Sequence, residues 1–295
     1  MTDVLSLGSL AQIACVLEAT ARKPGNVHRF RDFEGLTYLE FLLSAQAISA
    51  PLDAAPALGL GPTILQAVTA TRRVVRSNTN LGLILALTPL CLLDLEDSPR
   101  EALPRILEAT TVDDARAVYQ AIRLANPGGL GATAEQDVAT EPTLTLVEVM
   151  RLASDRDSIA RQYGDGYADV LDVGLPELAI AIREGRPTET AVILTHLRLM
   201  SERPDTLIAR KRGYEEATES ARRAQAVLRE GWPDGASGRA RLAELDAWLR
   251  GVGHARNPGT TADLVAAALF LALRDGTIQL PVGVGGTGWS SPDAP

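Results

Sequence analysis

Apolar residues recur along most of the chain at intervals of three and four, which is the spacing of one face of an α-helix. In the first such segment Leu10, Ala14 and Leu17 share a face, and a Lys-Pro-Gly turn ends the pattern at 23–25. No segment shows the strict alternation of a half-buried strand. The pattern therefore predicts an all-α fold, with helices over 7–21, 38–52, 62–76, 81–95, 99–109, 112–124, 145–163, 170–183, 188–200, 206–228, 239–251 and 260–274.

One of these segments, 81–95, is rich in Leu on nearly every side and carries no charge before Asp94. A helix that is apolar all round is a buried helix, so we expect it to run through the middle of the domain. We see no internal repeat and predict a single large, bundle-like helical domain over 1–282, whose polar turns converge on one cleft. The Gly-, Ser- and Pro-rich segment 283–295 lacks apolar residues to offset its ordering entropy, which predicts a flexible tail.

Composition supports helices and narrows the function. Hydrophobic residues make up 46% of the chain but aromatic residues only 4%, and a Leu- and Ala-rich core suits close-packed helices. The net charge of −8 argues against a nucleic-acid or anionic-membrane surface, which needs a basic face. No run of about 18 uncharged apolar residues occurs, and no basic residue precedes the first apolar stretch, so we expect a cytoplasmic protein.

Cys15 and Cys91 lie in apolar runs without metal-ligand spacing, which predicts two buried, reduced thiols.

Four polar islands interrupt this apolar scaffold, each at a predicted helix end where unpaired backbone N–H groups can bind an anion. We call them island 1 (22–29), island 2 (78–80), island 3 (126–129) and island 4 (257–263). Island 1 carries four basic side chains around one rigid turn: Arg22, Lys23, His28 and Arg29. A triphosphate requires such an arrangement, and a solvated basic loop between helices is the alternative interpretation.

Two carboxylates lie close to these islands. Thr260 or Thr261 can cap the last predicted helix, and Asp263 then falls in its first turn as either a capping acid or a magnesium ligand. Glu18 lies on an apolar helix one turn before Lys23. Unless Glu18 points outward, burial of its charge requires a partner such as Lys23 or a metal.

The segment 154–163 carries acids and arginines on one predicted helix. Asp157 and Arg161 have the spacing of an ordinary surface salt bridge, whereas the functional interpretation places Asp155 and Arg156 in the site. The three histidines show no metal-binding spacing, so the sequence does not support a transition-metal site. We expect His196 in the core or facing a partner.

Islands 1, 2 and 4, in this order, resemble motifs of the triphosphoribosyl-dephospho-CoA synthase family, helical transferases that join the ribose triphosphate of ATP to dephospho-CoA and release adenine. The family's Pro-Lys-Pro-Gly turn after a Glu-bearing helix corresponds to Glu18 and 23–25. Its Asn-Thr-His-Lys-Gly corresponds to 78–82, and its Pro-Gly-Gly-Ser-Ala-Asp-Leu to 258–264. Arg156 falls where the family has Arg-Gly-Glu, and the resemblance covers most of the chain.

The chain also departs from the family pattern. Asn80 and Leu81 stand where the family has His-Lys, and 35–40 replaces its Gly-Ala-His-x-Asp-Met. These changes imply different phosphate contacts. The sequence is similar to a divergent branch found in archaea and in bacteria that use methanopterin-type C1 chemistry, so the acceptor is open between dephospho-CoA and a related alcohol.

The resemblance implies a magnesium-dependent substitution at the anomeric carbon of ATP, with ATP and dephospho-CoA or a related acceptor as substrates. It implies catalytic roles for Asp263, Glu18 and Asp155, of which Asp263 and Glu18 would also hold Mg²⁺. The substrate-binding residues that it implies are Lys23, Gly25, Asn26, His28, Asn78, Thr79, Asn126, Arg156, Asn257, Gly259 and Thr260.

Two other functions are open. The same carboxylates and magnesium could activate water, in a hydrolase of a nucleotide or an ADP-ribose-like substrate. A helical protein that binds a nucleotide without turning it over would use the 81–95 helix and the tail as interaction elements. The abundance of Leu and Ala on helices is compatible with a helix-mediated homodimer.

Overall fold

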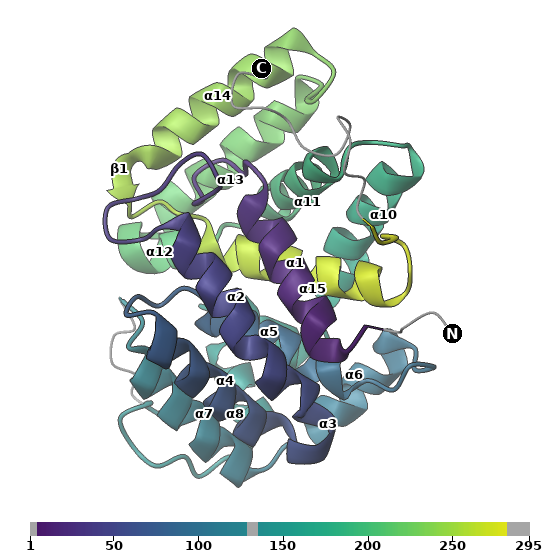
Figure 1. Ribbon diagram of the computed structural model, residues 1–295. Helices are drawn as coiled ribbons and strands as arrows, with labels where there is room; N and C mark the ends of the chain where they lie inside the picture. Colours follow the sequence, from purple (N-terminus) through teal and green to yellow (C-terminus); the bar gives the residue numbers. More distant parts are fainter. Residues whose placement is uncertain (1–4, 129–134, 282–295) are drawn as a thin grey trace. The chain divides into compact units, whose positions relative to one another are not determined.

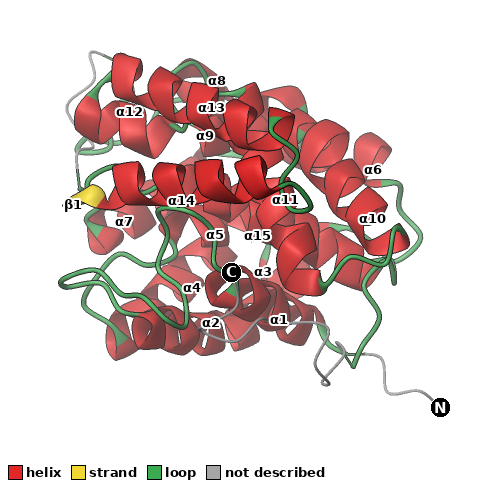
Figure 2. Cartoon of the chain, turned by 90° about the horizontal axis from the view of Figure 1, so that it is seen from above, coloured by secondary structure: helices red, strands yellow, loops and turns green. Residues whose placement is uncertain are grey.

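The computed structural model describes residues 5–128 and 135–281, which are almost entirely helical (Figures 1 and 2). The helices are α1 (Leu7–Thr20), α2 (Tyr38–Asp53), α3 (Ala55–Leu58), α4 (Leu60–Val74), α5 (Leu81–Leu87), η1 (Pro89–Leu92), α6 (Pro99–Glu108), α7 (Val112–Ala125), α8 (Leu146–Ala153), α9 (Ser158–Asp165), η2 (Asp169–Gly174), α10 (Leu175–Arg183), α11 (Thr188–Glu202), α12 (Thr206–Arg212), α13 (Tyr214–Arg229), α14 (Ala236–Arg250) and α15 (Gly259–Arg274). Within the described ranges the one named strand is the four-residue β1 (Gly251–His254). The predicted all-α class is confirmed, and the predicted tail over 283–295 lies outside the described residues.

The chain forms two compact units, each made of separate stretches of sequence. Unit 1 comprises Met1–Val16 and Leu39–Ala168, and unit 2 comprises Leu17–Tyr38 and Asp169–Pro295. The unit boundary falls inside α1, so the chain is not two domains in tandem. The single domain over 1–282 stays a prediction, and each unit is described below by itself.

Three predicted helices are interrupted, and each break has a local cause. The helix predicted over 81–95 ends at Leu87 because Pro89 has no N–H to donate, and the short η1 follows. The segment 145–163 forms α8 and α9, because Asp157 accepts hydrogen bonds from the backbone N–H groups of Ile159 and Ala160 and so starts a new helix. The segment 206–228 is divided into α12 and α13 at Gly213, which has a φ of 91°.

In unit 1, the buried helix α5 is held by two tyrosines from around the end of α9. The hydroxyl of Tyr163 donates to the carbonyl of Leu85 at 2.8 Å, and the hydroxyl of Tyr167 donates to the carbonyl of Ala86 at 2.8 Å. Pro89 cannot supply the helical hydrogen bond that the Leu85 carbonyl would otherwise accept. Burial raises the pKa of both phenols, so they stay protonated and act as donors. The burial predicted for 81–95 is confirmed over most of 81–93, whereas Asp94 and Leu95 are exposed.

In unit 2, α15 is the central helix and is buried along nearly its whole length. It packs against η2, α10, α11 and α12, while α13 packs against α11, α12 and α14 (Figure 1). Many of its buried positions are Ala, whose small side chain lets neighbouring helices approach closely. Gly259 and Asp263, one turn apart at its start, are only half-buried and mark the face of α15 that opens from the core.

Two further expectations concern the thiols and the membrane. Cys15 and Cys91 are both buried and form no disulfide, as predicted. Among the helices of 5–128 and 135–281, none combines the length and the apolar character that crossing a bilayer demands.

We expect Tyr163→Phe to lower the free energy of unfolding by about 1–3 kcal/mol, because the buried carbonyl of Leu85 would lose its donor. Urea denaturation followed by circular dichroism measures this loss. Tyr214→Phe is the matched control, because this side chain is 70% exposed and its change should leave the midpoint unaltered. Equal midpoints for the two variants would contradict the assignment.

Candidate functional site

Islands 1 and 4 come together in unit 2. The side-chain amide of Asn26 donates to the side-chain oxygen of Asn257 at 2.5 Å, and both residues are buried. The two asparagines are far apart in the sequence, and each lies in or beside a Pro-Gly turn. The structure therefore joins two of the predicted motifs by a direct contact.

Island 1 is anchored by a buried ion pair. The Lys23 ammonium lies 2.8 Å from a carboxylate oxygen of Glu18 and also donates to the backbone carbonyls of Glu18 and Ala21. The Lys23 side chain has no exposed surface, and Glu18 is 4% exposed. Lys23, one of the partners predicted for Glu18, pairs with it in the structure. Because all three ammonium protons have acceptors, the pair fastens the Lys-Pro-Gly turn to the end of α1.

The two arginines of island 1 bind the same acid. The guanidinium of Arg29 forms a bidentate pair with the Glu189 carboxylate, with nitrogen–oxygen distances of 2.8 and 3.1 Å. The backbone N–H of Arg22 donates to Glu189 at 3.1 Å, and its guanidinium lies 3.4 Å away. Glu189 lies in the first turn of α11 and is buried. Island 1 is thus built into the protein and is not a solvated basic loop.

His28 is neutral in this environment. It is buried, and burial together with the nearby Arg250 and Lys23 cations lowers its pKa to about 4. Its Nδ1 accepts a hydrogen bond from the backbone N–H of Phe30 at 3.3 Å. At neutral pH His28 therefore contributes a hydrogen-bonding ring to island 1, and not the positive charge that a phosphate contact would use.

In island 4 the predicted capping arrangement is wrong. The helix α15 begins at Gly259 after Pro258, so Asp263 lies in its second turn and no acid lies in its first. The cap comes from Asp205, whose Oδ2 accepts from the backbone N–H of Thr261 at 2.8 Å and from its hydroxyl at 2.7 Å. Thr261 is a donor here because the buried carboxylate is the stronger acceptor.

Asp205 caps a second helix with its other oxygen. Its Oδ1 accepts from the backbone N–H groups of Leu207 and Ile208 in the first turn of α12. Burial raises the pKa of this carboxyl, and the hydrogen bonds from Thr261, Ile208 and Leu207 act in the opposite direction. The sequence analysis did not identify Asp205, although an Asp directly before a predicted helix is the usual signal of an N-cap.

The remaining candidates of island 4 lie near the start of α15. Thr260 is buried, and its hydroxyl lies 3.4 Å from that of Thr206. A Cβ on Gly259 would come within 2.7 Å of the Leu207 side chain, so this position is closely packed. Within 5–128 and 135–281 no three His, Cys, Asp or Glu side chains are grouped so that they could hold a metal ion. The magnesium site predicted at Asp263 and Glu18 stays a prediction.

The candidates in unit 1 occupy three separate loops. In island 2, Asn78 is exposed and accepts from the backbone N–H of Leu81 at 3.2 Å, while Thr79 is buried with its hydroxyl 2.5 Å from that of Ser44. In island 3, Asn126 is exposed and ends α7 in a left-handed conformation, with a φ of 47°. Gly129, the last residue of island 3, lies outside the described residues.

Asp155 and Arg156 lie in the turn between α8 and α9, and both are exposed. Arg156 donates to the carbonyl of Leu152 at 3.2 Å, a contact within its own turn. Asp157, which the sequence pattern paired with Arg161, serves as the N-cap of α9. His196 is fully buried in α11, which confirms its expected place in the core.

Comparison with known proteins identifies relatives of this chain. The model of the family described as "CitG: ATP:dephospho-CoA triphosphoribosyl transferase" matches residues 5–281. A protein of Stutzerimonas stutzeri (strain A1501), named "Probable 2-(5''-triphosphoribosyl)-3'-dephosphocoenzyme-A synthase", is 30% identical over 166 residues, which are 52% of this chain and 57% of that protein. A protein of the same name from Pseudomonas fluorescens (strain Pf0-1) is 34% identical over 116 residues, 39% of each chain. The matched stretches thus span 57% and 39% of these two relatives.

A solved structure is similar over a longer stretch. The crystal structure of an Archaeoglobus fulgidus protein described as a triphosphoribosyl-dephospho-CoA synthase superposes with a TM-score of 0.63 at 27% sequence identity. The superposition covers 81% of this chain and 99% of the archaeal chain.

We expect Lys23→Met to lower the free energy of unfolding by about 3–5 kcal/mol, because it leaves the buried Glu18 carboxylate without its partner. The double variant Glu18→Gln/Lys23→Met should recover much of this loss, since neither charge then remains. Urea denaturation of the single and double variants measures the coupling. As a control, Arg222→Met at the exposed pair with Glu219 should not change the midpoint. A double variant less stable than Lys23→Met would contradict the buried-charge explanation.

The lowered pKa of His28 predicts a loss of stability in acid. Between pH 6.5 and about 4 the unfolded chain binds a proton that the folded chain does not, so stability falls as the pH falls through this window. We expect a contribution of about 1–2 kcal/mol, discounted for partial screening by solvent. Unfolding midpoints of the wild type and of His28→Gln at pH 7 and pH 4.5 measure it. A pH dependence of the same size in the variant would refute this origin.

Proposed function

Because the chain belongs to the ATP:dephospho-CoA triphosphoribosyl transferase family, we propose that it transfers the triphosphoribosyl group of ATP to the hydroxyl of dephospho-CoA or a related alcohol and releases adenine. The observation that carries this proposal is the hydrogen bond between Asn26 and Asn257, which joins islands 1 and 4 at residues that directly flank two motifs of the family.

The reaction is a substitution at the anomeric carbon of the ribose. A bond forms between C1′ and the oxygen of the acceptor hydroxyl, and the bond from C1′ to N9 of adenine breaks. The acceptor hydroxyl loses its proton, and adenine gains one proton on a ring nitrogen as it leaves, so the protons balance. The transition state resembles an oxocarbenium ion, so a nearby carboxylate stabilises the developing positive charge on the sugar.

Asp263 is the candidate carboxylate best suited to this role. It is half-buried on the open face of α15, one turn from Gly259, and it lies in the same island as Asn257. Glu18 is engaged by Lys23, so we assign it to holding the island 1 turn. Asp155 is a third candidate in unit 1. The amides of Asn26 and Asn257 would orient the ribose or the phosphates.

Magnesium is part of the proposal. Mg²⁺ is usually bound in enzymes by one or two carboxylates together with the substrate phosphates, so a cluster of three acids is not needed. Asp263 has the chemistry to supply one such carboxylate. When bound, the ion would neutralise phosphate charge. The cations of island 1 are engaged by Glu18 and Glu189, which makes the added positive charge more important.

We expect purified protein to release adenine from MgATP only when dephospho-CoA is present, and Asp263→Asn to lower that rate by about a hundredfold or more through lost charge stabilisation. Chromatography of free adenine measures the release. The matched control is Asp275→Asn, an exposed acid after the end of the same helix, which should keep the wild-type rate.

Two results would overturn this function. Adenine or ribose-triphosphate release without any acceptor would identify a hydrolase. Binding of MgATP without adenine release, with dephospho-CoA and then related alcohols present, would identify a nucleotide-binding protein.

A further inference from the structure

The last turn of α14 contacts both islands of unit 2. No motif in the sequence points to this helix, and none of its residues belongs to the predicted site. Asp246 and Arg250 contact island 1, and β1 leads from the end of the helix toward island 4. The contacts are made by different side chains of the same turn.

Two charged residues at one-turn spacing hold island 1. A carboxylate oxygen of Asp246 accepts from the backbone N–H of Gly25 at 2.8 Å and from Nε of Arg250 at 2.8 Å. Arg250 in turn donates to the backbone carbonyl of Asn26. Its guanidinium is largely buried, with 6% of the side chain exposed, so this bond is shielded from water.

The packing between these elements leaves no space for a side chain at Gly25. A Cβ there would lie 2.7 Å from the Leu249 side chain, and the φ of Gly25 is 75°. The Lys-Pro-Gly turn can therefore lie flat on α14 only because this residue is glycine. Asp246, Leu249 and Arg250 together fix the backbone that carries Asn26.

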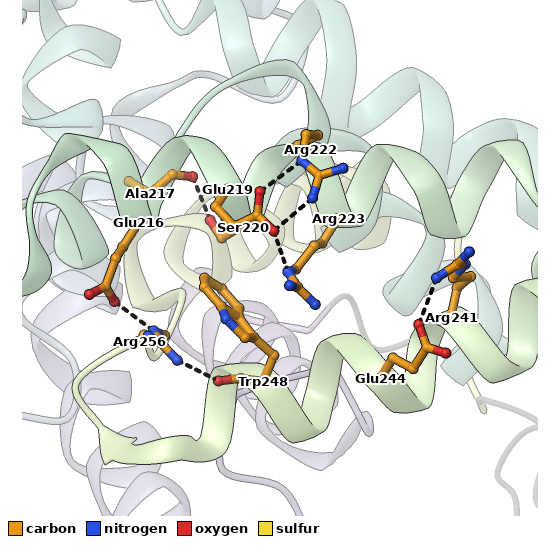
Figure 3. A network of polar contacts seen from close by, with 10 residues as sticks. All are labelled: Glu216, Ala217, Glu219, Ser220, Arg222, Arg223, Arg241, Glu244, Trp248 and Arg256. Atoms are coloured by element: carbon orange, nitrogen blue, oxygen red, sulfur yellow. Dashed lines mark hydrogen bonds and ion pairs between the residues drawn. The ribbon is translucent and has the colours of Figure 1, made fainter.

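Trp248, which lies between Asp246 and Arg250 on α14, contacts island 4 through Arg256. Arg256, which directly precedes Asn257, donates to the backbone carbonyl of Trp248 at 3.0 Å, and its guanidinium lies 4.1 Å from the centre of the indole ring (Figure 3). Its Nε donates to Glu216 of α13 at 2.6 Å. Arg223 lies over the same indole at 4.8 Å. The two hydrogen bonds and the contact with the indole face together restrict the position of Arg256, and with it the backbone next to Asn257.

We propose that the last turn of α14 is a positioning element for the transferase site. Asp246 and Arg250 set Asn26, and Trp248 sets Asn257 through Arg256, so one rigid turn brings the two amides to their 2.5 Å contact. This inference rests on the proposed function and adds to it residues that do not touch substrate. Small misplacements of orienting groups are known to cost about a hundredfold in rate.

The test uses Asp246→Ala, Arg256→Ala and the double variant, assayed for acceptor-dependent adenine release from MgATP. Each single variant should lower kcat by about tenfold to a hundredfold, with a smaller change in KM, because the groups that touch substrate are still present. Both variants disturb the same contact, so the double variant should lose little more than the worse single one. Trp248→Phe keeps an aromatic face for Arg256 and should retain most of the activity that Trp248→Ala loses.

The matched control lies on the same helix. Arg241 and Glu244 form an exposed ion pair with each other on α14, at 2.8 Å (Figure 3). Glu244→Ala should keep wild-type kcat and KM. If Asp246→Ala fails to fold by circular dichroism, Asp246→Asn replaces it, because the amide oxygen can still accept from Gly25 while the charge pairing with Arg250 is lost.

The outcomes separate this inference from the proposed function. If the wild type is active and the Asp246 and Arg256 variants match Glu244→Ala, the positioning role is wrong and the function stands. Multiplying losses in the double variant, with parallel losses of stability, would also overturn it. If the wild type releases no adenine, the proposed function fails, and calorimetry with MgATP then decides the inference: the Asp246 and Arg256 variants must bind more weakly than Glu244→Ala.

Discussion

Lys23 has no exposed surface, so its charge has to be balanced inside the protein. The carboxylate of Glu18 balances it at 2.8 Å, and two backbone carbonyls accept the remaining protons of the ammonium group. Either charge left alone would cost several kcal/mol, so the chain must turn back at the end of α1 for the pair to form. The Lys-Pro-Gly turn is thereby fixed, and the contacts of Gly25 and Asn26 with α14 and island 4 depend on its position.

The requirement that buried polar groups have partners also organises other parts of the structure. Asp205 lies at the start of two helices and accepts four hydrogen bonds from α12 and α15, which positions island 4. In unit 1, Tyr163 and Tyr167 supply donors to carbonyls at the end of α5, where a proline interrupts the helix. These side chains hold neighbouring elements in place, because a buried carbonyl or N–H without a hydrogen-bond partner lowers the stability of the fold.

The charge distribution limits how island 1 can act. Its lysine and its two arginines share the carboxylates of Glu18 and Glu189, and His28 carries no charge at neutral pH. The turn is therefore a rigid frame with paired charges, and amides and backbone groups are its means of orienting a ligand. The proposed substitution at an anomeric carbon depends on such orientation together with one well-placed carboxylate. Arg250 and Asp246 of α14 complete the frame from outside the family motifs.

The sequence by itself determined most of the helical segments, that most of 81–95 is buried, and that Glu18 and Lys23 are close enough along one helix end to pair. These properties follow from local spacing, because helical periodicity and one-turn neighbours are set within a few residues. The tertiary structure alone decided that Asn26 meets Asn257, that Glu189 binds the arginines of island 1, and that Asp205 caps α15. Those partners come from distant parts of the chain and are chosen by packing, for which no local spacing exists. The sequence also failed to predict the break before α9 at Asp157, because the apolar periodicity continues through it. Whether an Asp caps a new helix at such a position depends on the direction that packing imposes on that helix.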